Sequence, residues 1–232
     1  MTDDRRPDAG VAIVVGAGGE LGRATAVKLA DRGMTVVAVD RNEPCLEGLP
    51  DGIAREVFDA TDPNAAAPMI ERIVLDVGPP KALVNTIGAF QTGDVLSTTP
   101  DLLRLMMDVN LGSALWLSQA VAPSMQGTGS GAIVHIAARP GIEPSPGMAA
   151  YSASKAALVH LVRILDLELR PSGIRVNSVA PQLLDTARAR ASFPEEVLAH
   201  AVAPESIAEV VAFLVSDEAA PISGAILPAY GA

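Results

Sequence analysis

Short runs of apolar residues alternate with longer amphipathic stretches along the whole chain. Residues 11–15 (Val-Ala-Ile-Val-Val) contain no polar position, which is typical of a strand buried on both faces. A glycine cluster follows, and residues 21–31 then have helical spacing, with Gly33 placed to end the helix. A second apolar run, residues 35–40, ends in an acid. The first forty residues therefore predict a βαβ unit.

The same alternation continues toward the carboxyl end. Strands that alternate with helices predict a parallel sheet covered by helices on both faces, because each connection crosses over one face. We expect an α/β fold with a doubly wound sheet and a single domain over residues 1–232. Residues 185–203 lack a strand pattern and are expected to form a mobile substrate lid or a helical flap. Further strands are predicted at 54–58, 82–85, 132–136, 175–179 and 225–228.

Composition narrows the class of protein. With 232 residues, 49% hydrophobic and 19% charged, the chain can bury a full core and is not a disordered protein. Its net charge of -10 argues against a nucleic acid or an anionic membrane as partner and favours a small molecule. Its single cysteine, Cys45, excludes an internal disulfide, and no spaced set of Cys and His indicates a metal site. Residues 1–10 are polar and no apolar run is long enough to cross a membrane, so we expect a cytoplasmic protein.

The glycine cluster has the context of a nucleotide-binding turn. It lies between a predicted strand and a predicted helix, where small residues let backbone amides approach a pyrophosphate, although a tight turn alone is the alternative. Asp40 ends the next strand, where its carboxylate can accept hydrogen bonds from a ribose and would repel a 2'-phosphate. This favours NAD over NADP. Arg41 weakens the preference, since a guanidinium can receive that phosphate.

Tyr151 and Lys155 lie one helical turn apart in Tyr-Ser-Ala-Ser-Lys, just before an apolar helix-forming stretch. An ammonium beside a phenol favours the phenolate, so we expect Lys155 to lower the pKa of Tyr151 toward the range useful for proton exchange. The pair is a candidate general acid and base. The alternative is an aromatic residue at the edge of the core beside a solvated charge.

Several motifs in one order resemble those of the short-chain dehydrogenase/reductase family, over nearly the whole chain. Residues 15–22 are similar to its Thr-Gly-x-x-x-Gly-x-Gly turn apart from Val15 and Glu20. Asn85-Thr86-Ile87-Gly88 resembles its Asn-Asn-Ala-Gly segment, residues 151–155 its Tyr-x-x-x-Lys signature and residues 181–186 its Pro-Gly-x-x-x-Thr segment. The resemblance implies cofactor contacts at Gly16, Gly18, Gly19, Leu21, Asp40, Arg41, Asp59, Ala60, Asn85, Gly88, Tyr151, Lys155, Pro181, Leu184 and Thr186.

The resemblance also implies a Rossmann fold, a homotetramer or homodimer, and hydride transfer between the nicotinamide of NAD(P) and a secondary alcohol or ketone. Tyr151 would move the proton, and Lys155 would bind the nicotinamide ribose. Asn110 matches the family's helix asparagine, which would link Lys155 to solvent through a water molecule.

One departure removes a hydroxyl from this pattern. The family has a serine thirteen residues before the tyrosine, and this chain has Ala138 there. Loss of such a donor costs about 10²–10³ in rate. Ser145, Gln182 or Arg139 could supply another donor, whereas strand alternation places His135 on the opposite face and indicates a structural role.

Two more departures concern the cofactor. Glu20 replaces a glycine of the turn, where it either opposes a pyrophosphate or stabilises the helix N-terminus. Gln182 replaces the glycine after Pro181, where it either narrows the site or caps the loop. An active NAD-dependent oxidoreductase is our first hypothesis, and the alternative is an impaired member that binds a nucleotide or a protein partner. Neither loop expected around the substrate, 141–150 or 185–203, carries a recognisable charge clamp that would identify it.

Overall fold

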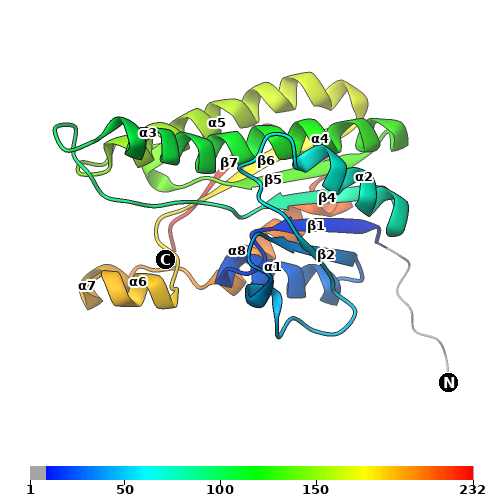
Figure 1. The fold of residues 1–232 in the computed structure, drawn as a ribbon, viewed down its shortest axis with the longest axis horizontal. Helices are drawn as coiled ribbons and strands as arrows, with labels where there is room; N and C mark the ends of the chain where they lie inside the picture. Colours follow the sequence, from blue (N-terminus) through cyan, green and yellow to red (C-terminus); the bar gives the residue numbers. More distant parts are fainter. Residues whose placement is uncertain (1–8, 232) are drawn as a thin grey trace.

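Seven parallel strands form one sheet in the computed structural model, which describes residues 9–231 (Figure 1). The strand order is β3-β2-β1-β4-β5-β6-β7, so the chain winds outward from β1 in one direction and then from β4 in the other. The doubly wound α/β fold is therefore confirmed, with its topological switch point between β1 and β4. The strands are β1 (Val11–Val15), β2 (Thr35–Asp40), β3 (Ala54–Val57), β4 (Pro80–Asn85), β5 (Gly131–Ile136), β6 (Ile174–Pro181) and β7 (Ile226–Ala229).

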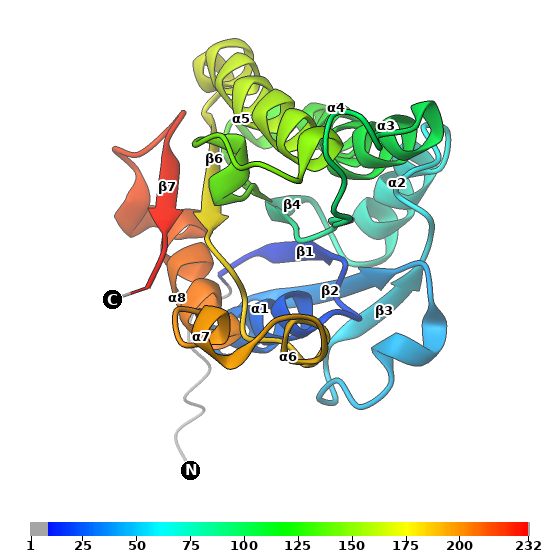
Figure 2. The ribbon, with the colours of Figure 1, turned by 90° about the vertical axis from the view of Figure 1, so that its left-hand side faces the viewer.

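Helices cover both faces of the sheet. Figure 2 shows α2, α4 and α5 on one face and α1 and α8 on the other. The segment 185–203, called the flap below, contains two short helices, α6 and α7, near the carboxyl ends of the strands. The α-helices are α1 (Glu20–Asp31), α2 (Ala66–Asp76), α3 (Pro100–Met107), α4 (Ser113–Thr128), α5 (Ala149–Leu169), α6 (Ala187–Ser192), α7 (Glu195–Leu198) and α8 (Pro204–Val215). The short helical turns are η1 (Glu43–Leu46), the π-helical η2 (Asp108–Gly112), η3 (Arg139–Gly141), η4 (Arg170–Ser172) and η5 (Asp217–Ala219).

Two hydrophobic cores lie on the two sides of the sheet. Ile13 and Leu83 face the core beneath α2, α4 and α5, whereas Val14 and Val84 face the core beneath α1 and α8. Successive side chains of a strand point to opposite faces, and here both faces are dry. This explains why the predicted strands have continuous apolar runs instead of alternation.

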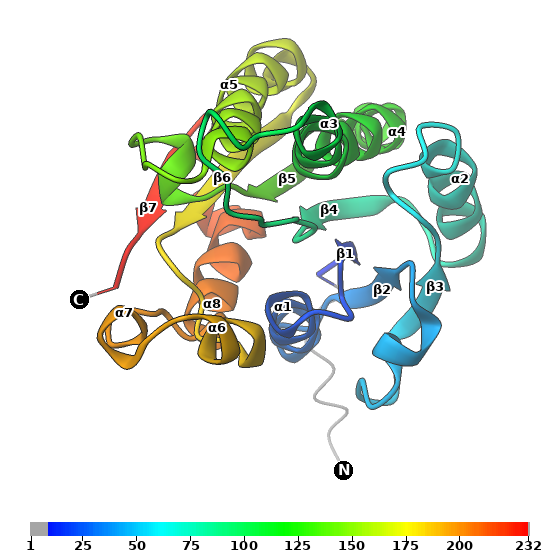
Figure 3. The ribbon, with the colours of Figure 1, turned by 60° about the vertical axis from the view of Figure 1, so that its left-hand side comes forward.

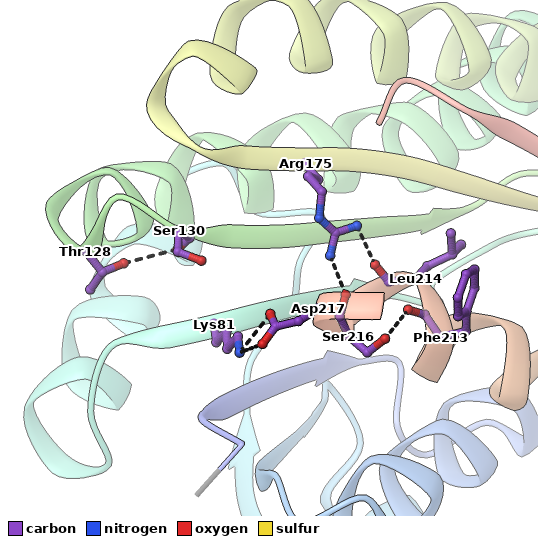
Figure 4. A network of polar contacts seen from close by, with 8 residues as sticks. All are labelled: Lys81, Thr128, Ser130, Arg175, Phe213, Leu214, Ser216 and Asp217. Carbon is purple, nitrogen blue, oxygen red and sulfur yellow. Dashed lines mark hydrogen bonds and ion pairs between the residues drawn. The ribbon is translucent and has the colours of Figure 1, made fainter. Parts of the chain in front are cut away.

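A polar network at the amino ends of the strands holds α8 against the sheet (Figure 4). Arg175, near the start of β6, donates hydrogen bonds to the carbonyl oxygens of Leu214 (2.7 Å) and Ser216 (3.0 Å) at the end of α8. Lys81 of β4 forms an ion pair with Asp217 at 3.1 Å. Arg175 thus satisfies carbonyl groups that a helix end leaves without partners, and Lys81 neutralises the acid that follows the helix, so this edge has a structural role.

Within residues 9–231, no helix is both long enough and apolar enough to span a membrane. The polar amino-terminal stretch predicted to lack a signal sequence lies mostly outside the described residues, which begin at position 9.

Candidate active site

The chain leaves β1 through a tight turn at the switch point. Gly16 has a φ of +85°, which a residue with a side chain rarely adopts. Its amide donates to the carbonyl oxygen of Val39 at 2.8 Å, and the amide of Gly19 donates back to the carbonyl oxygen of Gly16 at 3.1 Å. Thr86, at the end of β4, donates its hydroxyl to the carbonyl oxygen of Val15 at 2.8 Å. The ends of β1, β2 and β4 thus meet at the glycine turn.

The start of α1 fits a phosphate group. No side chain caps the helix at Gly19, and a Cβ on Gly19 would approach no heavy atom more closely than 3.5 Å. Uncapped amides at a helix N-terminus, with open space before them, attract an anion. The Glu20 carboxylate does not occupy these amides, because its Oε1 accepts a hydrogen bond from the amide of Ala187 at 2.8 Å. The turn therefore presents the donors that a dinucleotide phosphate needs.

Asp40 lies beside this turn at the end of β2. Its Oδ2 accepts from the amide of Gly18 at 3.0 Å and its Oδ1 from the amide of Asn42 at 3.1 Å. A Cβ on Gly18 would lie 2.8 Å from Asp40 Oδ2, so this close approach requires glycine. Arg41 is exposed and close enough to Asp59 to influence its charge.

The other residues expected near the adenosine have mainly structural contacts. Hydrogen bonds from the amide and hydroxyl of Thr61, with a smaller contribution from Arg41, lower the pKa of Asp59. Leu21 and Ala60 are buried in the core. These two can therefore contribute only backbone atoms to a ligand.

Tyr151 and Lys155 lie in the first two turns of α5, near the carboxyl ends of β4 and β5. Lys155 is buried, and its ammonium donates to the carbonyl oxygen of Ile136 at 2.8 Å. Burial lowers the pKa of Lys155 to about 8. The Tyr151 ring packs edge-on against Phe90, with 5.0 Å between ring centroids, and burial raises the pKa of Tyr151 to about 12.

The predicted decrease in the pKa of Tyr151 is therefore wrong for the free protein. The spacing of Tyr151 and Lys155 is as expected, but the ammonium donates to Ile136. The dominant effect on the phenol is desolvation, which disfavours the phenolate. The phenol keeps its proton at neutral pH.

Asn110 lies in the π-helical turn η2, and such turns often mark functional sites. Its Oδ1 accepts from the amide of Ala89 at 2.9 Å, and its Nδ2 donates to Ala89 O and Ser154 Oγ, both at 3.0 Å. A Cβ placed on Gly88 would lie 3.5 Å from both Asn110 Oδ1 and Lys155 Nζ. Gly88, Asn110 and Lys155 thus converge. The side chain of Asn110 ties the segment after β4 to α5.

Asn85 shapes the same segment from the end of β4. It is buried, its Oδ1 accepts from the amide of Ile87 at 3.0 Å, and its Nδ2 donates to Ser113 Oγ at 3.4 Å. These bonds hold the backbone that leads to Gly88.

Two of the three proposed replacements for the missing hydroxyl lie together beside Ala138. Arg139 Nη1 donates to Gln182 Oε1 at 2.9 Å, and Arg139 Nε donates to Glu143 Oε2 at 2.9 Å. The guanidinium also stacks 5.0 Å from the ring centroid of Tyr230. The third, Ser145, lies in the loop between η3 and α5.

His135 is fully buried on the α4 side of the sheet, with its Nε2 3.0 Å from Ser118 Oγ. Burial, with a smaller contribution from the charge of Lys155, lowers the pKa of His135 to about 3. The imidazole is therefore neutral, as a structural histidine would be.

Residues 182–184 connect the end of β6 at Pro181 to the flap. Leu184 packs against the core beneath α1 and α8. Thr186 caps α6 by accepting from the amide of Ala189 at 3.2 Å. Leu184 and Thr186 thus fix the start of the flap. Figure 3 shows the first flap helix, α6, beside α1, which follows the glycine turn.

A family model described as short chain dehydrogenase matches residues 10–197. The chain belongs to this family. It is 33% identical to the meso-2,3-butanediol dehydrogenase of Serratia marcescens over 97% of this chain and 95% of that protein. It is 32% identical to a 3-oxoacyl-acyl-carrier-protein reductase of Escherichia coli (strain K12) over 95% of this chain and 96% of that protein.

The fold agrees with the sequence relatives. A structure of NAD+-bound xylitol dehydrogenase superimposes with a TM-score of 0.89 at 28% identity, covering 97% of this chain and 99% of that one. The chain is therefore a short-chain dehydrogenase/reductase with a Rossmann fold, in an oxidoreductase family that uses nicotinamide cofactors and small-molecule substrates.

Sequence reasoning did not single out two side chains of this short-chain dehydrogenase that contact the candidate site. Phe90 packs on Tyr151, and Ser154 bonds to Asn110. Phe90 lies two residues after Gly88, and Ser154 lies inside the Tyr-x-x-x-Lys motif. Both residues could have been predicted as part of the site from their position next to these recognised motifs.

Proposed function

We propose that the protein is an NAD-dependent oxidoreductase that transfers hydride between the nicotinamide and a secondary alcohol or ketone, with Tyr151 as general acid and base. One observation carries the proposal: the half-buried Tyr151 packs edge-on against Phe90, one helical turn from the buried Lys155. Gly88 lies beside both this ammonium and Asn110. A half-buried phenol beside a buried ammonium, at the carboxyl edge of a doubly wound sheet, suits proton transfer beside a dinucleotide.

The protonated phenol of the free protein is suited to act as the acid when a carbonyl is reduced. With a pKa of about 12, Tyr151 holds a proton that it can donate to the alkoxide oxygen formed when a ketone receives hydride. The bound nicotinamide supplies or accepts that hydride. Lys155 would bind the nicotinamide ribose through its ammonium, and Asn110 would connect Lys155 to solvent.

Asp40 supports NAD as the cofactor. The amides of Gly18 and Asn42 hold its carboxylate at the end of β2, beside the phosphate-binding turn. There it can accept from ribose hydroxyls and would repel a 2'-phosphate. Arg41 lies toward Asp59 and is the competing signal for NADP.

Gln182 is our candidate for the donor that replaces the family serine. Arg139 donates to its Oε1, which orients the amide and leaves Nε2 as a donor near the strand ends. Parallel pairing of Ile136 with Val179 brings the chain after β5 alongside the chain after β6, so Gln182 follows close to Ala138. We also propose a tetramer or a dimer. In such an assembly α5 would pack against a second copy of the chain and bury its exposed Leu167 and Ile164.

The test is NADH oxidation and NAD reduction over a panel of ketones and secondary alcohols, with Tyr151→Phe as the control. Loss of turnover in Tyr151→Phe with cofactor binding retained is expected, and equal rates would refute the role of Tyr151. Gln182→Ala should lower the turnover rate about 10²-fold. Adding Ala138→Ser to that variant should restore the rate, because the serine supplies the missing donor.

The second hypothesis, an impaired nucleotide-binding protein, is favoured by the methyl group at Ala138 and the carboxylate at Glu20. Calorimetry separates the two. Tight NAD binding without turnover, unchanged by Ala138→Ser, would establish the second hypothesis.

A further inference from the structure

Glu20 joins two distant parts of the chain across the carboxyl edge of the sheet. It is the first residue of α1, and its Oε1 accepts the 2.8 Å hydrogen bond from the amide of Ala187, the first residue of α6. Figures 2 and 3 both show α6 beside α1. The carboxylate thus ties the phosphate-binding turn to the flap. We call this hydrogen bond the latch.

The two ends of the flap are fastened together at its base. Asp185 N donates to Val202 O at 2.9 Å, and Val202 N donates to Leu183 O at 2.8 Å. A segment pinned at one base can move as a unit about that base. The latch thus fastens the flap to α1 at a point away from this base.

The flap also reaches the candidate catalytic tyrosine. Arg188 Nη2 donates to the carbonyl oxygen of Phe90 at 3.3 Å, and the Phe193 ring lies 6.2 Å from the Phe90 ring. Phe90 in turn packs on Tyr151. The latched flap thus spans from the phosphate-binding turn to the tyrosine.

The latch places negative charge beside the glycine turn. A phosphate at the start of α1 would lie next to the Glu20 carboxylate, and like charges at that range repel. Arg190 of the flap has a pKa raised mainly by its hydrogen bond to Asp185, with a smaller contribution from Glu20. The flap therefore attracts the carboxylate while a phosphate would repel it.

We propose that Glu20 keeps the flap closed in the free protein and that its carboxylate, held near the start of α1, opposes the binding of a pyrophosphate there. This inference rests on the dinucleotide binding proposed above. Affinity for the cofactor is then reduced by charge repulsion, and we call this opposition between Glu20 and a bound phosphate the competition. Glu20 is thus a residue that sets cofactor affinity and couples it to the flap.

Trypsin tests the latch without any cofactor, because Arg188 and Arg190 lie within the flap. In Glu20→Gly, we expect cleavage after these two arginines to become about tenfold faster than in the wild type. Glu20→Gln, which keeps an acceptor and removes the charge, should give an intermediate rate. Glu205→Gln, a first-turn acid of α8, is the matched control and should cleave like the wild type. Urea unfolding of each variant shows whether global stability has changed.

Calorimetry with NAD tests the competition. We expect the Kd to fall about tenfold in Glu20→Gly and to fall also in Glu20→Gln, with no change in Glu205→Gln. Wild-type cleavage rates in both Glu20 variants would overturn the latch. Faster cleavage with an unchanged Kd would overturn the competition. Faster cleavage with no NAD binding in any variant would support the latch, overturn the competition and refute the proposed cofactor.

Discussion

Burial of Lys155 should make the stability of this protein depend on pH in a way that one substitution removes. The ammonium is buried with its hydrogen bond to Ile136, and desolvation lowers its pKa from 10.5 to about 8. That change corresponds to about 3 kcal/mol of unfavourable burial of the charged form. Lys155→Met keeps much of the side-chain volume and removes the charge.

The direction follows from proton binding. The folded-state pKa of Lys155 lies below the unfolded-state value, so between about pH 8 and pH 10.5 the folded state binds fewer protons and stability rises with pH. This contribution is complete above pH 10.5 and is lost as the pH falls through about 8. Between pH 7 and pH 9.5 it amounts to about 2 kcal/mol.

Urea unfolding of the wild type and Lys155→Met at pH 7 and pH 9.5 measures this difference. The wild type should gain about 2 kcal/mol more than the variant on going to pH 9.5. Groups that titrate in both proteins, including Tyr151, cancel in the comparison. Lys28→Met, which removes a surface ion pair with Glu209 and keeps Lys155, is the control and should gain as much stability as the wild type. A gain below about 0.5 kcal/mol relative to Lys155→Met would refute the reasoning from burial.

Asn110→Ala should lower the free energy of unfolding by about 1–3 kcal/mol, because it leaves the half-buried amide and carbonyl of Ala89 without their partner. Asn64→Ala, at an exposed position, should cost less than about 0.5 kcal/mol, and equal losses in urea would contradict the structural role of Asn110. Gly18→Ala should destabilise by about 1–3 kcal/mol and weaken NAD binding at least about tenfold, because the new methyl group would lie 2.5 Å from Cys45 Cβ and 2.8 Å from Asp40 Oδ2. In Gly19→Ala the nearest atom is 3.5 Å away, so similar losses of stability in both variants would disprove the steric account.

Features set by neighbours along the chain could be predicted from the sequence. The run Val11–Val15 formed a strand within its predicted bounds because continuous apolar residues suit a strand with two dry faces. Residues 174–181 extended beyond the predicted strand end, because pairing with β7 carries β6 through Pro181. Such pairing involves residues far along the chain and leaves no local signal.

The sequence by itself determined the sheet and its order of elements, the glycine turn before α1 and the one-turn spacing of Tyr151 and Lys155, because periodicity and spacing are local properties. Only the tertiary structure decided the direction of the Tyr151 pKa, since that depends on how much water Phe90 and its neighbours exclude. It also decided that Glu20 bonds to an amide 167 residues away. Charge and burial act through space, so their effects at a site appear only after the chain has folded.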